Sequence, residues 1–570
     1  MNEQTLIKKN YEIWTKDPFD KKTISKVRHL KKFNSEDFND SFYKDLTFGT
    51  GGMRGIVGLG PNRVNKFTFG RNTQGISNYI LKKFNRKSNS VVIAFDCRNQ
   101  SEFLAKKVAE IFSANKIKVF LFNSLRPTPE LSYALIKLKC VCGIVITASH
   151  NPSNYNGYKV YWQDGGQIVP PIDSRLIKEI NNINFFDIKF KGNKNLIKII
   201  GKKIDDDFVK DCINNGKIGN SIRDNYKIVF TSLHGASYLI GPKVLKKAGY
   251  TQLKIVKEQA KPDGNFPTVK SPNPEDEEAL KMAKNLAKMN NSDIFIGTDP
   301  DSDRLGIGYR TKSGEYMILN GNQTMILLTE FLLSKYKTDL NQSYFIGSTV
   351  VSTPMIKNLA KAYNVDLKIG LTGFKWIAKM IYDHPNQKFI GGGEESYGYL
   401  VGDFVRDKDA VTSSLLACEL GSECKSKNID VKEYLINCYI KYGFFKEKLI
   451  SLEKKGVKGN KEIKSIIENL RNNPAKELAG SEVILIQDFQ KSEQIKCKSQ
   501  KKIILNFPKS NLLIFESEDG SRVAVRPSGT EPKIKFYFSV NMKLRSKEKY
   551  ERANSILEKK MDCLISEFKF

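Results

Sequence analysis

Long apolar runs are missing from this 570-residue sequence. No stretch approaches the roughly 18 residues that a membrane-spanning helix needs, and the opening residues lack the apolar segment of a secretory signal. The nine cysteines show no repeated pairing in their spacing, and only Cys140 and Cys142 are close in the sequence. This spacing argues against a disulfide framework and against a metal centre held by sulfur. The sequence therefore predicts no membrane partner and a cytoplasmic location.

Histidine is also scarce, with four residues in the whole chain. The nucleophile elbow G-x-S-x-G does not occur, so a Ser-His-Asp hydrolase is poorly supported. The glycine-rich segment 49–55 does not match G-x-G-x-x-G, and no Walker A sequence is present. No nucleotide site is implied.

Positive charge is abundant: the sequence has 93 Lys and Arg residues and 62 Asp and Glu residues, which gives a net charge of +31. Such a balance raises the possibility of nucleic-acid binding. The lysines are, however, spread along the whole chain, and no helix-turn-helix, RNA-recognition or zinc-finger signature is present. We interpret the charge as a diffuse solvated surface and predict no nucleic-acid partner.

Short β-branched and aromatic runs recur along the chain, each followed by turn residues and a helical pattern. This is the rhythm of repeated βα units, and ligands in such folds meet the loops that follow the strands. The predicted strands are Val91–Phe95, Val119–Phe122, Val141–Ile146, Lys227–Phe230, Asp293–Ile296, Tyr344–Ile346 and Lys388–Ile390.

The last hundred residues have a different pattern. Leu512–Phe515 and Arg522–Val525 flank an Asp519-Gly520 turn, which is a strong hairpin signal. A further strand is expected at Ile534–Val540, with a closing helix from about Ser546. These elements predict an α+β domain. Two lysine- and asparagine-rich stretches, 189–206 and 451–476, are predicted to be linkers or insertions.

A serine follows one predicted strand in Thr147-Ala148-Ser149-His150-Asn151-Pro152. Ser149 is the natural nucleophile of this loop, but a bare serine is weak and needs a base, a metal or prior phosphorylation. Taken alone, the loop could equally be a polar turn.

Three carboxylates at i, i+2 and i+4 follow another predicted strand in Asp299-Pro300-Asp301-Ser302-Asp303-Arg304. Their spacing fits a single hard cation, whereas an EF-hand would need Gly and Glu where Arg304 and Arg310 stand. Three aspartates so close would repel one another without compensation. The loop therefore predicts a metal site, with Mg²⁺ favoured because it bridges carboxylates to phosphate, over a solvated acidic turn.

Two further loops offer groups for a sugar phosphate. Arg526-Pro527-Ser528-Gly529-Thr530-Glu531-Pro532 combines a guanidinium, hydroxyls and an open backbone suited to an anion, although it could also be a structural turn. Gly391-Gly392-Gly393-Glu394-Glu395-Ser396 places carboxylates at a strand exit, where they could hold hydroxyl groups or simply begin a helix.

Taken together, these loops resemble the α-D-phosphohexomutases, in the phosphoglucomutase/phosphomannomutase branch. The segments TASHNP, DPDSDR, GEES and RPSGTEP stand in the family's order and spacing, over about residues 40 to 545. The resemblance implies an α/β fold with four domains around a central cleft, three of them α/β with mixed sheets and the C-terminal one α+β. We expect boundaries at 1–205, 206–315, 316–445 and 446–570.

The resemblance also implies roles for individual residues. Phosphorylated Ser149 would ligate Mg²⁺ together with Asp299, Asp301 and Asp303, while Arg54, His150 and Lys159 would lie at the catalytic centre. Lys159 is the expected general acid/base, with Arg54 as the alternative. The substrate-binding residues would be Arg304, Thr372, Gly373, Glu394, Ser396, Lys408, Arg526, Ser528, Gly529 and Thr530.

The implied reaction is the reversible interconversion of glucose 1-phosphate and glucose 6-phosphate through a hexose 1,6-bisphosphate, which would also act as activator. Mannomutase-like members often carry Gly-His after the sugar-binding serine, where this chain has Tyr397-Gly398, and Phe374 lies in the Thr-Gly loop. Both features favour glucose phosphates. A phosphopentomutase or phosphomannomutase with the same residues is the alternative, and a hydrolase using Ser149 is less well supported. The partners would be small sugar phosphates, and the chain is expected to be a monomer or weak dimer.

Overall fold

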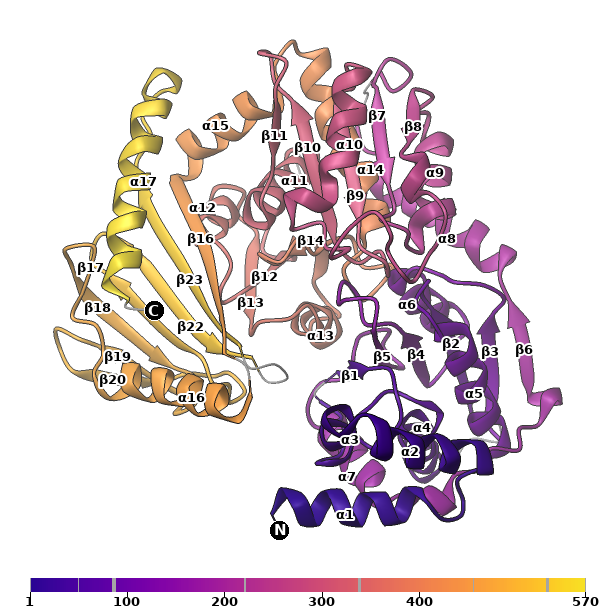
Figure 1. The fold of residues 1–570 in the computed structure, drawn as a ribbon. Helices are drawn as coiled ribbons and strands as arrows, with labels where there is room; N and C mark the ends of the chain where they lie inside the picture. The colour runs from indigo at the N-terminus through magenta and orange to yellow at the C-terminus, as the bar shows by residue number, and fades with distance from the viewer. Residues whose placement is uncertain are drawn as a thin grey trace. The chain divides into compact units, whose positions relative to one another are not determined.

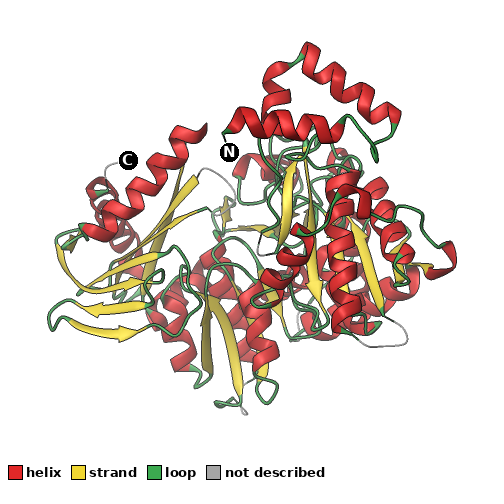
Figure 2. Ribbon diagram, turned by 90° about the horizontal axis from the view of Figure 1, so that it is seen from below, coloured by secondary structure: helices red, strands yellow, loops and turns green. Residues whose placement is uncertain are grey.

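The computed structural model describes residues 2–49, 51–84, 89–219, 222–336, 340–454, 456–528 and 533–568, with only the backbone for 456–458 and 460. These residues form two compact units. The first comprises Met1–Leu319, Ile381–His384 and Tyr397–Ser426. The second comprises Asn320–Met380, Pro385–Ser396 and Lys427–Phe570. Helices and strands alternate through much of the chain, as the α/β prediction requires (Figure 2).

The first unit begins with helices α1 (Glu3–Trp14), α2 (Lys21–Phe33) and α3 (Ser35–Phe42). Each helix is capped by the side chain of the residue before it, namely Asn2, Asp20 and Asn34. Such caps satisfy backbone N–H groups that have no partner within the helix. An aromatic cluster around the buried Trp14 joins these helices to one another through Phe19 and Phe42, and to later parts of the same unit through Phe67 and Phe185.

The first sheet has the strand order β1-β5-β4-β2-β3-β6 (Figure 1). Its centre is parallel, and β1 and β5 pair in the antiparallel direction at one edge. Nearly every residue of β2 and β4 is buried, because helices pack against the sheet. The elements are β1 (Gly52–Ile56), β2 (Ser90–Phe95), β3 (Lys118–Phe122), β4 (Cys142–Ile146), β5 (Tyr155–Trp162), β6 (Ile197–Ile200), α4 (Lys66–Lys83), α5 (Ser101–Ala114), α6 (Thr128–Lys137) and α7 (Ile172–Asn181).

The second sheet also lies in the first unit and has the order β11-β10-β9-β7-β8. Helix α14 packs on β9 and β10 and on the helices α8 and α9, although it comes from the third predicted domain. The strands of this sheet are β7 (Ile228–Thr231), β8 (Leu253–Ile255), β9 (Ile294–Thr298), β10 (Leu305–Arg310) and β11 (Tyr316–Ile318). The same part of the unit contains the helices α8 (Lys202–Gly216), α9 (Ser237–Ala248), α10 (Glu277–Met289) and α14 (Ala410–Ser426), and the strand β15 (Tyr399–Val401), which is not part of this sheet.

The second unit contains a parallel arrangement in which β12 lies between β13 and β14. Its helices pack beside these strands and lead into the C-terminal region. The elements are α11 (Gly321–Lys335), β12 (Tyr344–Thr349), α12 (Met355–Ala362), β13 (Asp366–Gly370), α13 (Lys375–Asp383), β14 (Lys388–Gly393) and α15 (Val431–Tyr442).

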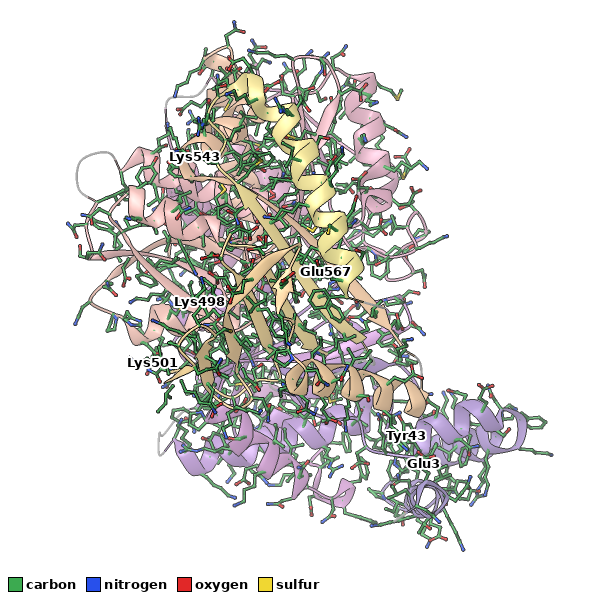
Figure 3. The ribbon with its side chains drawn as sticks, turned by 90° about the vertical axis from the view of Figure 1, so that its left-hand side faces the viewer. Glu3, Tyr43, Lys498, Lys501, Lys543 and Glu567 are labelled. Carbon is green, nitrogen blue, oxygen red and sulfur yellow. The ribbon has the colours of Figure 1, made fainter. Side chains whose placement is uncertain are left out.

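The C-terminal sheet is antiparallel and has the order β16-β23-β22-β21-β18-β19-β20, with β17 paired to β18. Helix α17 lies along β23 and β16 (Figure 1). Near its end, Oε2 of Glu567 accepts a hydrogen bond from the backbone N–H of Ala479, 3.0 Å away; Figure 3 labels Glu567, along with Lys498 and Lys501. The elements are β16 (Phe444–Glu453), α16 (Gly456–Asn472), β17 (Glu477–Leu478), β18 (Ser481–Asp488), β19 (Glu493–Lys496), β20 (Lys501–Ile504), β21 (Leu513–Ser517), β22 (Arg522–Pro527), β23 (Lys533–Met542) and α17 (Tyr550–Glu567).

The predicted four-domain architecture, with three α/β parts and an α+β tail, is confirmed by these sheets. The hairpin at Asp519-Gly520 is also confirmed, and Gly520 has the positive φ of +80° that favours glycine in such a turn.

Of the two readings predicted for these stretches, linker or insertion, the linker reading is wrong for both, and the insertion reading stays a prediction. Segment 189–206 contains β6, the edge strand that pairs with β3, and segment 451–476 contains the end of β16 and helix α16. In both stretches an amphipathic pattern is diluted by lysine and asparagine on the exposed side, which conceals its period.

Candidate active site

Ser149 lies in the loop between β4 and β5 of the first unit and is 8 % exposed. Its Oγ donates a hydrogen bond to Oδ2 of Asp299 over 2.8 Å and lies 3.2 Å from Nδ1 of His150. The backbone N–H of Ser149 donates to Oγ1 of Thr147. Ser149 has a φ of +52°, in the left-handed region that non-glycine residues rarely adopt. The loop therefore aims its hydroxyl group at the aspartate cluster.

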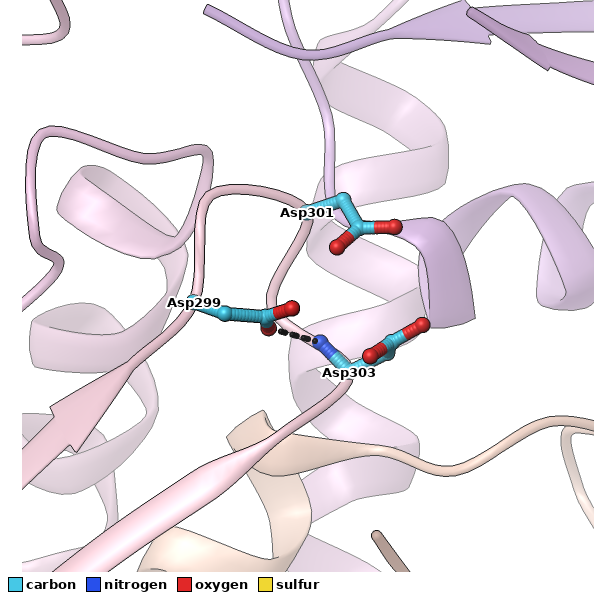
Figure 4. Close-up of side chains that lie close together, drawn as sticks. All are labelled: Asp299, Asp301 and Asp303. Carbon is cyan, nitrogen blue, oxygen red and sulfur yellow. Dashed lines mark hydrogen bonds between the residues drawn. The ribbon is translucent and has the colours of Figure 1, made fainter. Parts of the chain in front are cut away.

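Asp299, Asp301 and Asp303 form a buried carboxylate cluster after β9 (Figure 4). One oxygen atom from each lies within 4.8 Å of the others. Oδ1 of Asp299 accepts hydrogen bonds from the backbone N–H groups of Asp303 and Arg304, both over 2.9 Å. These bonds wrap the loop around the first carboxylate.

Backbone contacts from three other elements fix this acidic loop. The carbonyl of Pro300 accepts from the N–H of Ala236, that of Asp301 from Thr128, and that of Ser302 from Ala410. The hydroxyl of Thr128, in the first turn of α6, also donates to Oδ2 of Asp301 over 2.9 Å. The N-terminal ends of helices α6, α9 and α14 therefore hold the cluster.

The donor set of this cluster fits a hard divalent cation. Among the described residues, Oδ1 of Asp301 and Oδ1 of Asp303 are buried without a hydrogen-bond partner. Buried carboxylate oxygens need compensation, and Mg²⁺ prefers oxygen ligands of this kind. Ser149 and the three aspartates would therefore hold the magnesium ion that the sequence predicts.

Two lysines contact the same cluster. Nζ of Lys159, on β5, lies 2.6 Å from Oδ2 of Asp301 and 2.9 Å from Oδ2 of Asp303, and Nζ of Lys408 lies 2.9 Å from the latter atom. Burial disfavours the charged forms of both Lys159 and Asp303. The attraction between the lysine ammonium groups and the aspartate carboxylates outweighs this effect, so the pKa of Lys159 is raised and the pKa of Asp303 is lowered. For Asp299, burial and repulsion from Asp301 and Asp303 raise the pKa well above its ordinary value.

Arg54 and His150 lie beside the serine loop. Arg54, on β1, donates from Nη1 to Oδ1 of Asn151 over 3.1 Å. Burial, together with the nearby guanidinium groups of Arg304 and Arg54, lowers the pKa of His150 well below its ordinary value. Arg304 forms an ion pair with Glu275. The first unit thus brings together all the predicted metal ligands with Arg54, His150, Lys159, Arg304 and Lys408.

The other predicted binding residues lie in the second unit. Glu394 is 4 % exposed after β14. Its neighbour Glu395 accepts hydrogen bonds from the hydroxyls of Thr349 and Ser352, each over 3.1 Å. These bonds fix the backbone that leads to Ser396.

Thr372 and Gly373 follow β13. The Oγ1 atom of Thr372 is buried without a partner among the described residues. Gly373 has a φ of +108°, with no atom within 4 Å of the position that a Cβ would take. The loop therefore presents a hydroxyl and an unobstructed backbone.

Arg526 lies on β22 opposite Lys535 of β23. The backbone N–H of Ser528 donates to the carbonyl of Lys533 over 2.7 Å, which closes the base of the predicted phosphate-binding loop. Gly529 and Thr530 lie outside the described residues. Burial raises the pKa of Tyr537, whose charged neighbours include Glu394, Glu395 and Arg526.

Three residues of the site were not predicted from the sequence: Thr128, Asn151 and Glu275, which bind Asp301, Arg54 and Arg304 respectively. Thr128-Pro129-Glu130 carries the signature of a helix N-terminus, which could have located α6. No local pattern shows which distant side chain each residue meets. These pairs are separated by 173, 97 and 29 positions, and only the fold brings their members together.

Family models match all four parts of the chain. They describe phosphoglucomutase/phosphomannomutase alpha/beta/alpha domains I, II and III over residues 45–187, 206–312 and 320–442, and the C-terminal domain over 462–550. The phosphoglucomutase of Staphylococcus aureus strain MSSA476 is 39 % identical over 537 residues, which cover 93 % of this chain and 95 % of that protein.

Solved structures share the fold. The open form of the Paramecium phosphoprotein pp63/parafusin, a phosphoglucomutase, aligns with a TM-score of 0.67 at 17 % identity and covers 92 % of this chain and 96 % of its own. A phosphoglucomutase/phosphomannomutase family protein from Burkholderia thailandensis aligns with a TM-score of 0.65 at 18 % identity, covering 91 % and 97 %.

Fold and site together define a four-domain α/β enzyme with a serine beside a carboxylate cluster. The chain belongs to the phosphoglucomutase/phosphomannomutase family of the α-D-phosphohexomutases. In the part of the chain that the structure describes, no helix is both long and apolar enough to cross a membrane.

Proposed function

We propose that the chain interconverts glucose 1-phosphate and glucose 6-phosphate, with Ser149 as the phosphoryl carrier. One observation carries this proposal: the Ser149 hydroxyl binds Asp299, one of three clustered buried aspartates, and the other two contact Lys159. A nucleophile, a cation site and a proton carrier are the groups that phosphoryl transfer needs. The 39 % identity to a phosphoglucomutase supports glucose as the sugar.

The reaction consists of two transfers in opposite directions. The free hydroxyl of the sugar phosphate attacks the phosphorus of phospho-Ser149, the bond to the serine oxygen breaks, and a hexose 1,6-bisphosphate forms. The bisphosphate then reorients, Ser149 attacks its other phosphorus, the bond from that phosphorus to the sugar oxygen breaks, and the serine regains a phosphoryl group as the hexose monophosphate leaves. A hydroxyl proton is lost and the departing oxygen gains one in each transfer, so one donor-acceptor group can serve both steps.

Lys159 is the proposed proton carrier, with Arg54 as the alternative. Asp301 and Asp303 keep the Lys159 ammonium protonated, so it can donate a proton to the departing oxygen. Mg²⁺, when bound, neutralises charge on the transferring phosphoryl oxygens. Because His150 is held neutral, it adds no positive charge beside Ser149. The Ser149 proton goes to Asp299, so Nδ1 of His150 would be the donor towards the serine oxygen.

The remaining predicted residues bind the substrate in this proposal. Glu394 and Ser396 hold sugar hydroxyl groups, because carboxylate and hydroxyl oxygens accept from several donors. Four further residues are proposed to bind the substrate, namely Arg304, Lys408, Thr372 and Gly373. The phosphate that is not transferred binds the loop of Arg526, Ser528, Gly529 and Thr530, where a guanidinium offers paired charge-assisted bonds.

A coupled assay tests the function directly. The reaction contains glucose 1-phosphate, Mg²⁺ and a trace of glucose 1,6-bisphosphate, which primes Ser149, and it is repeated with mannose and ribose phosphates. We expect the highest kcat/KM with glucose phosphate and no release of inorganic phosphate. A higher value with mannose or ribose phosphate would assign the alternative mutase, and stoichiometric phosphate release would assign a hydrolase. A cytoplasmic location and a monomer or weak dimer complete the proposal.

A further inference from the structure

A buried guanidinium holds the backbone of the serine loop. Arg98 follows β2, is 3 % exposed, and belongs to no predicted site motif. Its Nη1 donates to the carbonyls of Pro152 and Tyr155 over 2.8 and 3.0 Å. Its Nη2 donates to the carbonyl of Ser149 over 2.7 Å and to that of Asn151. One side chain thus binds four carbonyl groups within seven residues of the loop that carries the nucleophile.

These carbonyl groups need such a partner because the loop turns back on itself. With Ser149 in the left-handed region, the chain leaves the sheet and its carbonyl oxygens point to the interior. Buried carbonyls without donors are costly, so the backbone would rearrange if the donors were removed. The direction of the Ser149 hydroxyl depends on this backbone, whose present conformation brings Oγ within 2.8 Å of Oδ2 of Asp299.

Arg98 is itself fixed from several sides. Its Nε lies 3.4 Å from Oδ2 of Asp96, and Oδ1 of Asp96 accepts from the backbone N–H of Arg98 and from Oγ of Ser101. The ring of Phe266, from the segment after β8, lies 5.1 Å from the guanidinium carbon. The guanidinium is planar and offers five donors in a rigid arrangement, whereas a lysine ammonium offers three from a single atom.

We propose that Arg98 is a positioning residue for phosphoryl transfer, which holds the Ser149 loop so that the serine oxygen faces the aspartate cluster. The inference rests on the proposed function for its kinetic consequence, but the hold on the loop is a property of the fold. None of the hydrogen bonds described above joins Arg98 to the carboxylates of the metal cluster, Asp299, Asp301 and Asp303, or to a predicted sugar-binding residue. Its loss should therefore lower kcat much more than it alters KM.

The test compares Arg98→Lys with Arg63→Lys. Arg63 is an equally suitable buried arginine, 4 % exposed and paired with Asp37 and Asp40 of the N-terminal helices. We expect Arg98→Lys to lower kcat about 100-fold, as a misplaced reacting group does, with KM within about threefold. Arg63→Lys should retain the wild-type kcat. Wild-type kcat in Arg98→Lys, or an equal loss in both variants, would overturn the proposal.

Hydrogen exchange of the peptide covering residues 147–156 gives a second measurement that needs no catalysis. Exchange there should be faster in Arg98→Lys and unchanged in Arg63→Lys. If Arg98→Lys does not accumulate as folded protein, the same two measurements are made on Asp96→Asn. This substitution weakens the hold on Arg98 without removing the arginine, so we expect kcat to fall about tenfold. Unaltered exchange and kcat in Asp96→Asn would then contradict the proposal. Absence of mutase activity in the wild type would instead refute the proposed function, and the exchange comparison would still test Arg98.

Discussion

The hydroxyl oxygen of Ser149 lies 2.8 Å from Oδ2 of Asp299, although 150 positions separate the two residues in the sequence. Ser149 follows a strand of the first sheet, and Asp299 follows a strand of the second. Both strands end where loops can meet a ligand, as is usual in α/β folds. This contact joins the nucleophile to the carboxylate cluster and is the relationship on which the proposed chemistry depends.

Replacement of Asp301 by Asn should remove most of the activity and weaken Mg²⁺ binding. One carboxylate oxygen of Asp301 is buried without a hydrogen-bond partner and can therefore bind the cation. The amide of the asparagine variant is a weaker ligand because it carries no negative charge. We expect kcat/KM to fall at least about 100-fold and half-saturation to require at least about tenfold more Mg²⁺. Titration of activity with Mg²⁺ measures both. The control is Asp224→Asn, at an exposed aspartate of the same unit, and a fully active, metal-independent Asp301→Asn would show that the cluster is only structural.

Replacement of Arg526 by Ala should mainly weaken substrate binding. The loss of a charge-assisted contact to the phosphate should cost about 2–4 kcal/mol of transition-state stabilisation, seen largely as a higher KM. Lys535→Ala is the matched control, because Lys535 is the cross-strand partner of Arg526 and also carries a positive charge. Saturation kinetics with glucose 1-phosphate separate the two variants. A wild-type KM and kcat in Arg526→Ala would exclude this loop as the phosphate site.

The buried Asp409 should make the stability of the protein depend on pH. Its carboxylate caps α14 by accepting from Val411 and Thr412, and burial raises its pKa from 3.8 to about 6. The folded state therefore binds this proton more tightly than the unfolded state does. Stability is lost as the pH rises from about 4 to about 6 and stays reduced above that range.

Asp409→Asn should remove this penalty. The difference in free energy of unfolding, variant minus wild type, should increase by on the order of 2 kcal/mol between pH 4 and pH 7. Urea unfolding at several pH values measures it. Asp430→Asn, at the N-cap of α15, controls for the loss of a capping charge. A difference for Asp409→Asn that does not change with pH would contradict the raised pKa.

Much of the fold could be predicted because its signals are local. The strand runs at Val91–Phe95 and Val119–Phe122 are β-branched or aromatic and buried on both faces, so their apolar residues are nearly continuous. By contrast, two of the four residues of β6 are exposed, and this strand forms the edge of the sheet by pairing with β3. Its sequence resembles a polar linker, and only pairing with a neighbour makes it a strand.

The site was predictable where chemistry is concentrated in short motifs. Ser149 and the aspartate triplet stand out because few other functions explain such residues after strands. Arg98 and Thr128 could not be found in this way, because their partners are backbone carbonyls or a carboxylate far along the chain. Their roles depend on which loops the fold brings together, and a single sequence records this only indirectly.

The central claim is that Ser149 carries the phosphoryl group. Incubation with glucose 1,6-bisphosphate labelled with ³²P, followed by mapping of the labelled peptide, tests it most directly. We expect label on Ser149 in the wild type and in the control Ser153→Ala. In Ser149→Ala we expect no label and a loss of turnover by several orders of magnitude. Label at another residue, or wild-type turnover in Ser149→Ala, would show that Ser149 does not carry the phosphoryl group.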